Sequence, residues 1–474
     1  MDSVPQPRRP KGLSGGRVAR IAPLAGLAGR TVGEAVVASL RQRRHGPEGD
    51  DAWRPFHERN AERYAEWMGR SRGLLLKAAQ IMSVVLPDAA VGDDLRGIYR
   101  AAFVRLLDEV PPMPIDTVHE VLAAELGPRW AESFSEFQPV PVGSASIGQV
   151  HEATLRDGRR VAVKVQYPGV GEVIRSDLRN TELLGTFLRL MLSMMPGVAG
   201  SWDTKAIARE ITDRITEEID YRIEAKNHNE FAEAYRGHPF IRIPDLVPEL
   251  CTERVLGMDF VEGLRYAVAA EVDDAGLRDR WGEVIFRFGF GGLRTLRFGN
   301  ADANPGNFIF HADGTVTFLD FGCVTRHSEQ RLRGMFGFLK LAADGDAEGL
   351  HRWTSDVGHV AAHQLPAPET VLAFYREAYS WLFTDEPFTA TPEYFSRAMR
   401  TRLDRNGEFA GITRAMVMSP DMTMVTRLDT ATLGLLGGLH ATAPWRAIFD
   451  EYELGTAPAT PYGELDTAYR AAHR

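Results

Sequence analysis

Asp302-Ala303-Asn304-Pro305-Gly306-Asn307 places a carboxylate and an amide at the two ends of a proline-containing loop. Asp320-Phe321-Gly322 follows this loop after one predicted hairpin, whose turn is Asp313-Gly314. Carboxylate and amide oxygens suit a hard cation such as Mg²⁺, especially when phosphate oxygens complete its coordination. The two stretches therefore predict a magnesium site in which Asn307 and Asp320 are the protein ligands.

A lysine lies inside an apolar strand upstream of these stretches. Two short runs, Val150–Leu155 and Arg160–Gln166, predict strands joined by a turn at Asp157-Gly158. Alternation puts Ala162 and Lys164 on the same face of the second strand. Burying an ammonium group costs free energy unless an anion meets it, so Lys164 is predicted to contact phosphate groups. The alternative is a lysine at a sheet edge, with its stem buried and its head in water.

A run of small residues, Gly143-Ser144-Ala145-Ser146-Ile147-Gly148-Gln149-Val150, comes just before the first of these strands. Small residues let backbone N–H groups approach phosphate oxygens closely. No Gly-Lys-Ser/Thr follows, so the run is not a Walker A loop. Turns rich in small residues are common, and an ordinary turn is the alternative. Its position before the lysine strand makes this run a candidate phosphate-binding loop.

An acidic stretch lies on a predicted helix between these elements. Asp220 and Glu224 are four residues apart and share one face of that helix, where like charges repel unless a cation satisfies them. Glu224 is therefore the candidate partner of Lys164. The alternative is a solvated acidic face on which Glu218 pairs with Arg222.

The elements occur in the order that protein kinases require: phosphate loop, strand lysine, helix glutamate, catalytic loop and Asp-Phe-Gly. This order predicts that Lys164 holds phosphates, that Glu224 positions Lys164, and that Asp302 orients or deprotonates the acceptor. ATP and Mg²⁺ are the expected cofactors. The candidate nucleotide-binding residues are Gly143, Ser144, Ala145, Ser146, Ile147, Gly148, Val150, Ala162 and Lys164.

The same residues resemble the UbiB/AarF family of atypical kinases. Val142–Val150 followed by His151 resembles the alanine-rich loop of that family. Asp302 to Asn307 resembles its Asp-Pro-His-Pro-Gly-Asn loop, and Asp220-Tyr221 leading to Glu224-Ala225 resembles its Glu-x-Asp segment and helix glutamate. Lys77-Ala78-Ala79-Gln80 is similar to its Lys-x-Gly-Gln signature.

This resemblance implies an α+β, bilobal protein-kinase-like fold with a small β-rich N-lobe, a helical C-lobe and extra N-terminal helices. In the family, the Lys-x-Gly-Gln helix covers the opening that protein substrates use, and the Glu-x-Asp residues face it. Lys77, Gln80, Glu218 and Asp220 are thus the candidate regulatory residues. The resemblance implies an ATPase, or phosphotransfer to a small or lipophilic molecule in isoprenoid-quinone or lipid metabolism, rather than protein phosphorylation.

Four residues depart from the family pattern. Ala79 replaces the glycine of Lys-x-Gly-Gln, and Gly143 stands where alanine is frequent. Asn300 and Asn304 stand where the family often has histidine, and Asn304 offers no positive charge to a γ-phosphate. Asn304 leaves open the alternative of a nucleotide-binding scaffold with weak catalysis. A small-molecule kinase of the aminoglycoside-phosphotransferase kind is a further alternative, and the Lys77–Gln80 and Ser146–Val150 segments weigh against it.

Four segments are expected along the chain. They are a basic flexible arm (1–50), a helical extension (51–110), the N-lobe with inserted helices (111–262) and the helical C-lobe (263–474). The expected helices include Asp116–Leu126, Val170–Met195, Thr204–Arg236 and Leu277–Leu296, and a further strand is expected at Thr252–Phe260.

Composition narrows the classes of partner. A net charge of −9 over 474 residues argues against nucleic-acid binding. The two cysteines, Cys251 and Cys323, cannot build a disulfide framework, which suits the cytoplasm. The sequence has no run of about 18 uncharged apolar residues, so no membrane-spanning helix is predicted. The arginine-rich arm with its apolar stripe predicts peripheral contact with an anionic membrane, against the alternatives of a disordered tail or a docked helix.

Overall fold

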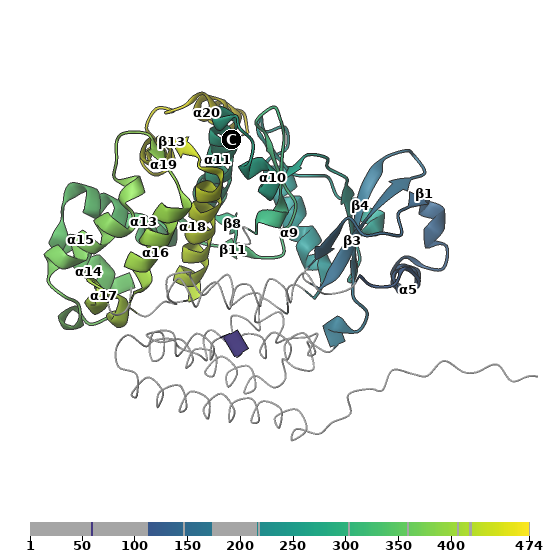
Figure 1. Ribbon diagram of the computed structural model, residues 1–474, viewed down its shortest axis with the longest axis horizontal. Coiled ribbons are helices and arrows are strands. Elements are labelled where there is room, and N and C mark those ends of the chain that lie inside the picture. Colours follow the sequence, from purple (N-terminus) through teal and green to yellow (C-terminus); the bar gives the residue numbers. More distant parts are fainter. Residues whose placement is uncertain are drawn as a thin grey trace, which may run out of the picture.

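The small lobe lies at one end of the molecule and the helices of the large lobe lie at the other (Figure 1). The computed structural model describes residues 112–145, 147–172, 219–301, 304–357, 360–404, 407–416 and 420–473, together with Glu58, Arg59 and Thr216. The predicted α+β layout of a small β-rich lobe and a larger helical lobe is therefore confirmed in these segments. The basic arm, the Lys77–Gln80 segment and most of the inserted helices lie outside the described residues.

A five-stranded antiparallel sheet forms the small lobe, in the order β1-β3-β4-β6 with β2 paired to β3. One helix, α5 (Ile115–Leu126), packs on this sheet through its buried residues. The strands are β1 (Phe134–Phe137), β2 (Gly143–Ala145), β3 (Gly148–Leu155), β4 (Arg160–Gln166) and β6 (Val255–Asp259).

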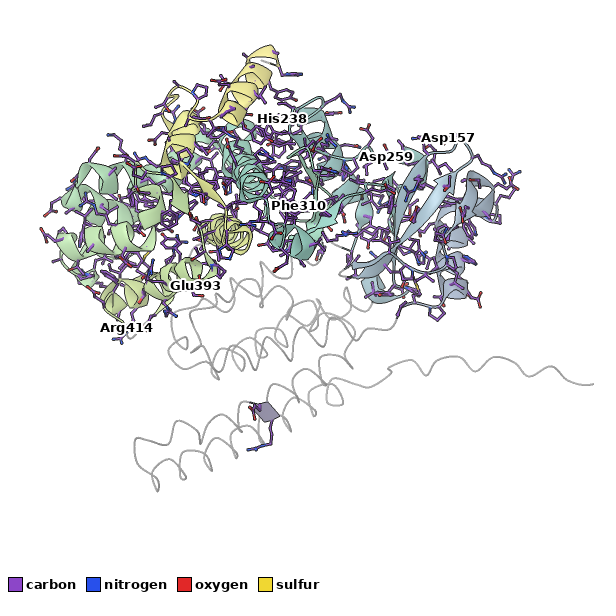
Figure 2. All side chains as sticks on the ribbon, turned by 45° about the horizontal axis from the view of Figure 1, so that its top comes forward. Asp157, His238, Asp259, Phe310, Glu393 and Arg414 are labelled. Carbon is purple, nitrogen blue, oxygen red and sulfur yellow. The ribbon has the colours of Figure 1, made fainter. Side chains whose placement is uncertain are left out.

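The two faces of β4 differ as the alternation predicted. Val161, Val163 and Val165 are buried in the apolar core that α5 covers. Ala162 and Lys164 therefore lie on the opposite face, which is turned away from that core. The Asp157-Gly158 turn joins β3 to β4 at the outer tip of the lobe, where Figure 2 labels Asp157. The turn requires a positive φ, and Gly158 supplies it at 89°.

Helix α9 (Tyr221–Ala234) lies between the small sheet and the large lobe (Figure 1). The predicted helix Thr204–Arg236 is wrong at its centre, because Ile219 and Asp220 are not helical. Asp220 is instead the N-cap of α9, with an extended backbone and a side chain that accepts a hydrogen bond from the Arg222 N–H. Aspartate favours this position because its carboxylate satisfies an orphan donor of the first turn.

The large lobe has one continuous apolar core that contains Trp281, Phe310, Trp381 and Trp445, and Figure 2 labels Phe310 inside the lobe. Its helices are α10 (Tyr266–Ala270), α11 (Ala275–Phe286), α12 (Gly292–Leu296), α13 (Glu329–Asp344), α14 (Ala347–Val357), α15 (Pro368–Ala378), α16 (Pro392–Leu403), α17 (Ala410–Ala415), α18 (Pro420–Leu439), α19 (Trp445–Glu453) and α20 (Pro461–Ala472). A π-helical turn, η4 (Arg287–Gly291), joins α11 to α12, so the helix expected at Leu277–Leu296 is present as three consecutive helical pieces.

Three small sheets support the loops of the large lobe. One has the order β5-β10-β9-β7, one pairs β8 with β11, and one pairs β12 with β13. The hairpin predicted around Asp313-Gly314 is present as β9 and β10, and Gly314 has a φ of 87°. The strands are β5 (Ile241–Arg242), β7 (Leu264–Arg265), β8 (Phe298–Asn300), β9 (Phe308–Phe310), β10 (Val316–Phe318), β11 (Val324–Arg326), β12 (Phe388–Thr389) and β13 (Thr442–Ala443).

None of the described helices combines the length and the apolar composition that crossing a bilayer requires.

Candidate functional site

Lys164 lies between two carboxylates from different parts of the chain. Its ammonium Nζ is 2.8 Å from Glu224 Oε1 and 2.9 Å from Glu224 Oε2. The same Nζ is 3.0 Å from Asp320 Oδ2. The pairing of Lys164 with Glu224 that the sequence predicted is therefore present. The neighbouring strands β3 and β6 fix the position of Lys164, which is in register with Val150 and Leu256.

Electrostatics keep Lys164 charged. Burial opposes the charged form, but the nearby carboxylates of Asp320 and Glu224 outweigh it, so the pKa of Lys164 is raised well above its usual value. The ring of Tyr221 adds a cation–π contact, with Nζ 4.9 Å from the ring centroid. Lys164 is thus a permanent positive charge near neutral pH and cannot act as a general base.

Glu224 is placed by the start of α9. It lies in the first turn of the helix, where the positive end of the helix dipole favours a carboxylate. Its side chain is only 4% exposed, so its charge depends on Lys164. Asp220 Oδ2 accepts a hydrogen bond from Arg222 Nη2 at 2.7 Å. The sequence predicted that Asp220 and Glu224 share a helix face, but Asp220 lies before the first residue of α9 and is its N-cap. Of the four candidate regulatory residues, Asp220 is therefore a helix cap in the structure. Lys77, Gln80 and Glu218 lie outside the described residues.

Asp320 is anchored through both its side chain and its main chain. Its Oδ1 accepts a hydrogen bond from the Gly322 N–H at 2.9 Å, while its Oδ2 faces Lys164. Its main-chain oxygen accepts a hydrogen bond from Asn300 Nδ2 at 2.7 Å. Asn300, which stands where the family often has histidine, is buried on β8 and ties that strand to the Asp-Phe-Gly segment.

The loop before β9 is bound to the strand that leads into Asp320. Asn304 Oδ1 accepts a hydrogen bond from the Gly306 N–H at 2.9 Å and caps the 3₁₀ turn Pro305–Asn307. The main-chain oxygen of Asn307 accepts one from the Leu319 N–H at 3.0 Å. Asn307 therefore lies beside the residue that precedes Asp320. Asp302 is outside the described residues.

The small-residue run is a hairpin rather than an open loop. β2 pairs with the start of β3, with Gly143 opposite Val150 and Ala145 opposite Gly148. A Cβ at Gly148 would lie 2.3 Å from the Val165 oxygen of β4, so only glycine allows this close strand approach. Ile147 is buried, and Ser146 lies outside the described residues.

Two buried amides near the site were not singled out from the sequence. Gln149 Oε1 accepts a hydrogen bond from the Met113 N–H at 2.7 Å, which ties the β2–β3 hairpin to the segment before α5. Asn227 Nδ2 donates to the Phe321 oxygen at 3.1 Å. Asn227 follows Glu224 by nearly one helical turn, so its position on the same face of α9 was the available signal.

The donor set suits a hard cation only when phosphate oxygens join it. In the described residues, no group of three or more His, Cys, Asp and Glu side chains could hold a metal ion by itself. Asp320 offers a carboxylate and Asn307 an amide from adjacent segments. Such sparse oxygen donors fit Mg²⁺, which binds through one or two protein ligands and substrate phosphates.

Comparisons with known proteins agree with this geometry. The sequence model of the ABC1 atypical kinase-like domain matches residues 105–354. The mitochondrial atypical kinase COQ8B of Rattus norvegicus is 30% identical over 391 residues, which cover 81% of this chain and 70% of that protein. The chloroplastic protein ACTIVITY OF BC1 COMPLEX KINASE 1 of Arabidopsis thaliana is 31% identical over 295 residues, 62% of this chain and 41% of that protein.

A solved structure is similar as well. It is the complex of Rv3197 with erythromycin from Mycobacterium tuberculosis, at 30% identity and a TM-score of 0.58. The match covers 79% of this chain and 89% of that chain. The similarity therefore extends over both lobes rather than over the nucleotide motifs alone.

Proposed function

Since the chain belongs to the UbiB/AarF family, whose common unit is the ABC1 atypical kinase-like domain, we propose that it binds ATP with Mg²⁺ and acts as an atypical kinase or ATPase. The single observation that carries this proposal is the buried ammonium of Lys164 between Glu224 and Asp320. A lysine in this position, paired with a helix glutamate next to Asp-Phe-Gly, is the arrangement with which kinases hold nucleotide phosphates.

Each residue has one proposed role. Lys164 holds the α- and β-phosphates, and Glu224 keeps its ammonium in place. Asn307 and Asp320 hold Mg²⁺, and a bound Mg²⁺ would neutralise charge on the phosphate oxygens. Backbone N–H groups of the β2–β3 hairpin cover the phosphates. Asp302 orients or deprotonates the acceptor.

The segment after Asp-Phe-Gly favours a small acceptor over a peptide. In protein kinases, the activation loop lies between Asp-Phe-Gly and Ala-Pro-Glu. Here β11 follows Gly322 almost directly, and Ser328 caps the start of α13. The tripeptide Ala367-Pro368-Glu369 occurs only after α13 and α14, at the start of α15, so it does not close an activation loop. The short connection supports an enzyme without a peptide-binding platform.

Lipophilic acceptors are the proposed class. Relatives named COQ8B and COQ8 are mitochondrial atypical kinases, and the structurally similar Rv3197 was solved in complex with erythromycin, a small molecule rather than a peptide. The family resemblance points to isoprenoid-quinone or lipid metabolism. The proposal includes cover of the site by Lys77 and Gln80, regulation through Glu218 and Asp220, and contact of the arm at 1–50 with an anionic membrane.

A nucleotide-binding scaffold with weak catalysis is the second candidate, and Asn304 is the observation that favours it. Its amide oxygen caps the 3₁₀ turn through the Gly306 N–H. The side chain therefore has a local structural role and carries no charge toward a γ-phosphate. On this alternative, Mg²⁺·ATP binds tightly but turns over slowly.

Asp320→Asn tests the proposed metal site. At an ATP concentration about a hundredfold above Kd, Mg²⁺·ATP should stabilise the wild-type fold by roughly 2.7 kcal/mol. Asp320→Asn should abolish the Mg²⁺-dependent part of the thermal shift, because the carboxylate ligand is replaced by a weaker amide. Asp344→Asn is the matched control, since Asp344 pairs with Lys340 on the surface of α13. An unchanged Mg²⁺·ATP shift in Asp320→Asn contradicts the metal assignment.

Turnover by the full chain separates the two candidates. ATP hydrolysis is measured with and without Mg²⁺, anionic liposomes and a phenolic lipid precursor. We expect Mg²⁺-dependent turnover that rises with liposomes or precursor, and a phosphorylated precursor identifies a transferase. A full thermal shift without turnover in any of these conditions supports the scaffold instead.

A further inference from the structure

Helix α9 holds Glu224, so the position of the whole helix decides whether Glu224 reaches Lys164. Glu224 lies in the first turn, 2.8 Å from Lys164 Nζ, and the rest of α9 runs away from this contact. In protein kinases this lysine–glutamate pair must be in place for catalysis, and movement of the helix controls it. The groups that fix the far end of α9 therefore matter for the site.

The middle of α9 contacts the Asp-Phe-Gly segment. Asn227 donates to the Phe321 oxygen at 3.1 Å, and the ring of Phe231 packs against that of Phe321 with centroids 4.6 Å apart. A shift of α9 along its axis would break these contacts together with the ion pair. The helix is thus coupled along its length to both halves of the site.

The far end of α9 is bound by the last helix of the described chain. Tyr469 of α20 has its hydroxyl oxygen 3.0 Å from the Ala234 oxygen and 3.1 Å from the Arg236 oxygen. The last carbonyl groups of a helix have no partner within the helix. Tyr469 supplies a donor to this end, from a helix that lies more than 230 positions away in the sequence.

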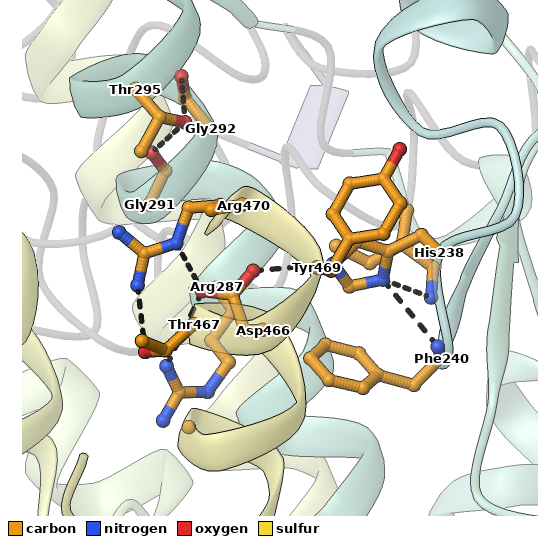
Figure 3. Close-up of polar contacts among 12 residues, drawn as sticks. His238, Phe240, Arg287, Gly291, Gly292, Thr295, Asp466, Thr467, Tyr469 and Arg470 are labelled. Atoms are coloured by element: carbon orange, nitrogen blue, oxygen red, sulfur yellow. Dashed lines mark hydrogen bonds and ion pairs between the residues drawn. The ribbon is translucent and has the colours of Figure 1, made fainter. Parts of the chain in front are cut away.

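A second contact joins α20 to the chain just after α9. His238 Nε2 lies 3.2 Å from Asp466 Oδ1, and His238 Nδ1 accepts a hydrogen bond from the Ile241 N–H at 3.1 Å. Because Nδ1 accepts, Nε2 carries the proton and donates to the carboxylate. The rings of His238 and Tyr469 also meet edge to face at 4.5 Å. Figure 3 shows Asp466 and Tyr469 on α20 facing His238.

Several groups of the large lobe bind α20 at Asp466. Asp466 Oδ2 accepts from the hydroxyl of Tyr452 at 2.6 Å and pairs with Arg470 Nε at 3.1 Å. Arg287 of η4 lies 3.8 Å from the same oxygen and is completely buried. Helix α20 is therefore bound to α19 and to the core of the large lobe on one side, and to the end of α9 on the other.

We propose that α20 positions helix α9. Tyr469 acts through the end of α9 and Asp466 acts through His238, and together they keep Glu224 against Lys164. This inference rests on the proposed function of the Lys164 site. Tyr469 and Asp466 do not contact Lys164, which is proposed to bind phosphates, or Asn307 and Asp320, which are proposed to bind Mg²⁺. They are therefore positioning residues. Loss of their contacts lets α9 move and lowers the fraction of molecules with the ion pair formed.

Tyr469→Phe tests the proposal with a small change. It removes the donor to α9 and keeps the ring against His238. We expect kcat for Mg²⁺·ATP turnover to fall about fivefold, as expected for one hydrogen bond, while KM for ATP changes less than twofold. Tyr462→Phe is the matched control, because it removes a hydroxyl of the same helix whose acceptor is the Gly314 oxygen at 3.3 Å. It should leave kcat unchanged.

Amide hydrogen exchange separates positioning from local loosening. In Tyr469→Phe, exchange should rise about fivefold at residues 222–228, at the end of α9 remote from the mutation. In Tyr462→Phe it should not. Faster exchange confined to residues 232–236 overturns the proposal, because it shows local loosening only. Exchange does not require turnover, so an inactive wild type that still shows the remote effect refutes the proposed function and leaves the positioning role supported.

A double variant adds a test on activity. In the Glu224→Gln background, Tyr469→Phe should lower kcat no further, because the contact through which α20 acts is already lost. The same fivefold loss in this background overturns the proposal.

Discussion

Among the described residues, two buried cations each lie between two carboxylates, and their surroundings differ. Arg287 on η4 is 0% exposed and binds Glu283 and both oxygens of Glu451, whose side chains are 10% and 2% exposed. Lys164 on β4 binds Glu224, which is 4% exposed, but also Asp320, which is 26% exposed. The Arg287 cluster is closed to solvent, whereas the Lys164 cluster is open on the side of Asp320.

This difference shows how similar charges can serve structure in one place and chemistry in another. Burial opposes the charge of Arg287, but hydrogen bonds to Glu451 outweigh it, so its pKa is raised above the usual range. All its hydrogen-bonding directions are filled by groups from α11, α19 and the start of α20. The open side of the Lys164 cluster instead allows phosphate oxygens and a cation to reach the charged groups.

The largest expected effect is on the closed cluster. Arg287→Met should destabilise the fold by about 3–5 kcal/mol, because it leaves the buried carboxylates of Glu283 and Glu451 without a cation. Chemical denaturation measures the loss. Once the unfolded fraction is corrected for, turnover should fall no more than about fivefold, the loss expected from Tyr469→Phe, because Arg287 also supports α20 through Thr460. A loss of less than about 1 kcal/mol would show that water reaches the Arg287 cluster. The two clusters would then not differ in their access to solvent.

The same substitution in the open cluster should act on activity. Lys164→Met should lower Mg²⁺·ATP turnover by about 10²–10³-fold, as expected when a charge that stabilises a transition state is removed. Its loss of stability should be less than half that of Arg287→Met. The reason is that the Asp320 carboxylate is 26% exposed, so water can hydrate its charge once the lysine is gone. Equal losses of stability in the two variants would contradict the assignment of an open and a closed cluster.

The sequence predicted the open cluster far better than the closed one. Lys164 in a valine-rich strand, Glu224 on a helix and Asp320 after an Asp-Gly hairpin each carried a local pattern with known chemistry. Arg287 offered only Glu283 one helical turn earlier, which is an ordinary surface pattern. Its decisive partner Glu451 is 164 positions away and has no local signature. Long-range pairing of this kind depends on how helices pack, which composition and periodicity do not encode.

Local errors had local causes. Asp220 fits an acidic helix face as well as an N-cap, and only the break at Ile219 shows that the cap is formed. The run Gly143–Ala145 lacks the alternation that announces a strand, because its residues are all small. It becomes β2 only through backbone pairing with β3.

Acid should lower the free energy of unfolding through His238, which contacts Asp466 next to the Arg287 cluster. Burial is the main cause that lowers the pKa of His238, and Arg287 and Arg470 lower it further, against the opposing effect of Asp466. The unfolded state therefore binds a proton near pH 6.5 while the folded state does not, so stability falls as pH drops below about 6.5. One such group changes the free energy of unfolding by at most about 1.4 kcal/mol per pH unit.

His238→Gln should therefore make the dependence of unfolding free energy on pH shallower between about pH 6.5 and 5.5. The slope will not vanish, because burial also lowers the pKa of other described histidines, namely His151, His228, His311 and His327. Lys164 remains charged throughout this range, since its pKa is raised. Denaturation curves at three pH values measure the slope, and an identical slope in wild type and variant would contradict a neutral His238.

Two glycines give the finest comparison. Gly463 lies beside the Arg287 cluster, and Gly143 on β2 is separated from Lys164 of β4 by Val150 of β3. A Cβ at Gly463 would lie 2.7 Å from Arg287 Nη2 and 2.8 Å from Glu451 Oε1. Gly463→Ala should therefore destabilise the fold by about 1–3 kcal/mol through overpacking of the closed cluster. Gly463→Ala is the control for Gly143→Ala.

Gly143→Ala should have the smallest effect and the opposite sign. A Cβ at Gly143 would have no heavy atom within 4 Å among the described residues, and Gly143 is not among the glycines with positive φ. Alanine fits there without strain, so it should stabilise the fold by about 0.4–1 kcal/mol by restricting the unfolded chain. Because β2 is one strand of the proposed phosphate-binding hairpin, KM for ATP should change in Gly143→Ala, whereas Gly463→Ala should leave KM for ATP unchanged. Destabilisation by Gly143→Ala, measured by the same denaturation curves, would show that the β2–β3 hairpin is as tightly packed as the Arg287 cluster.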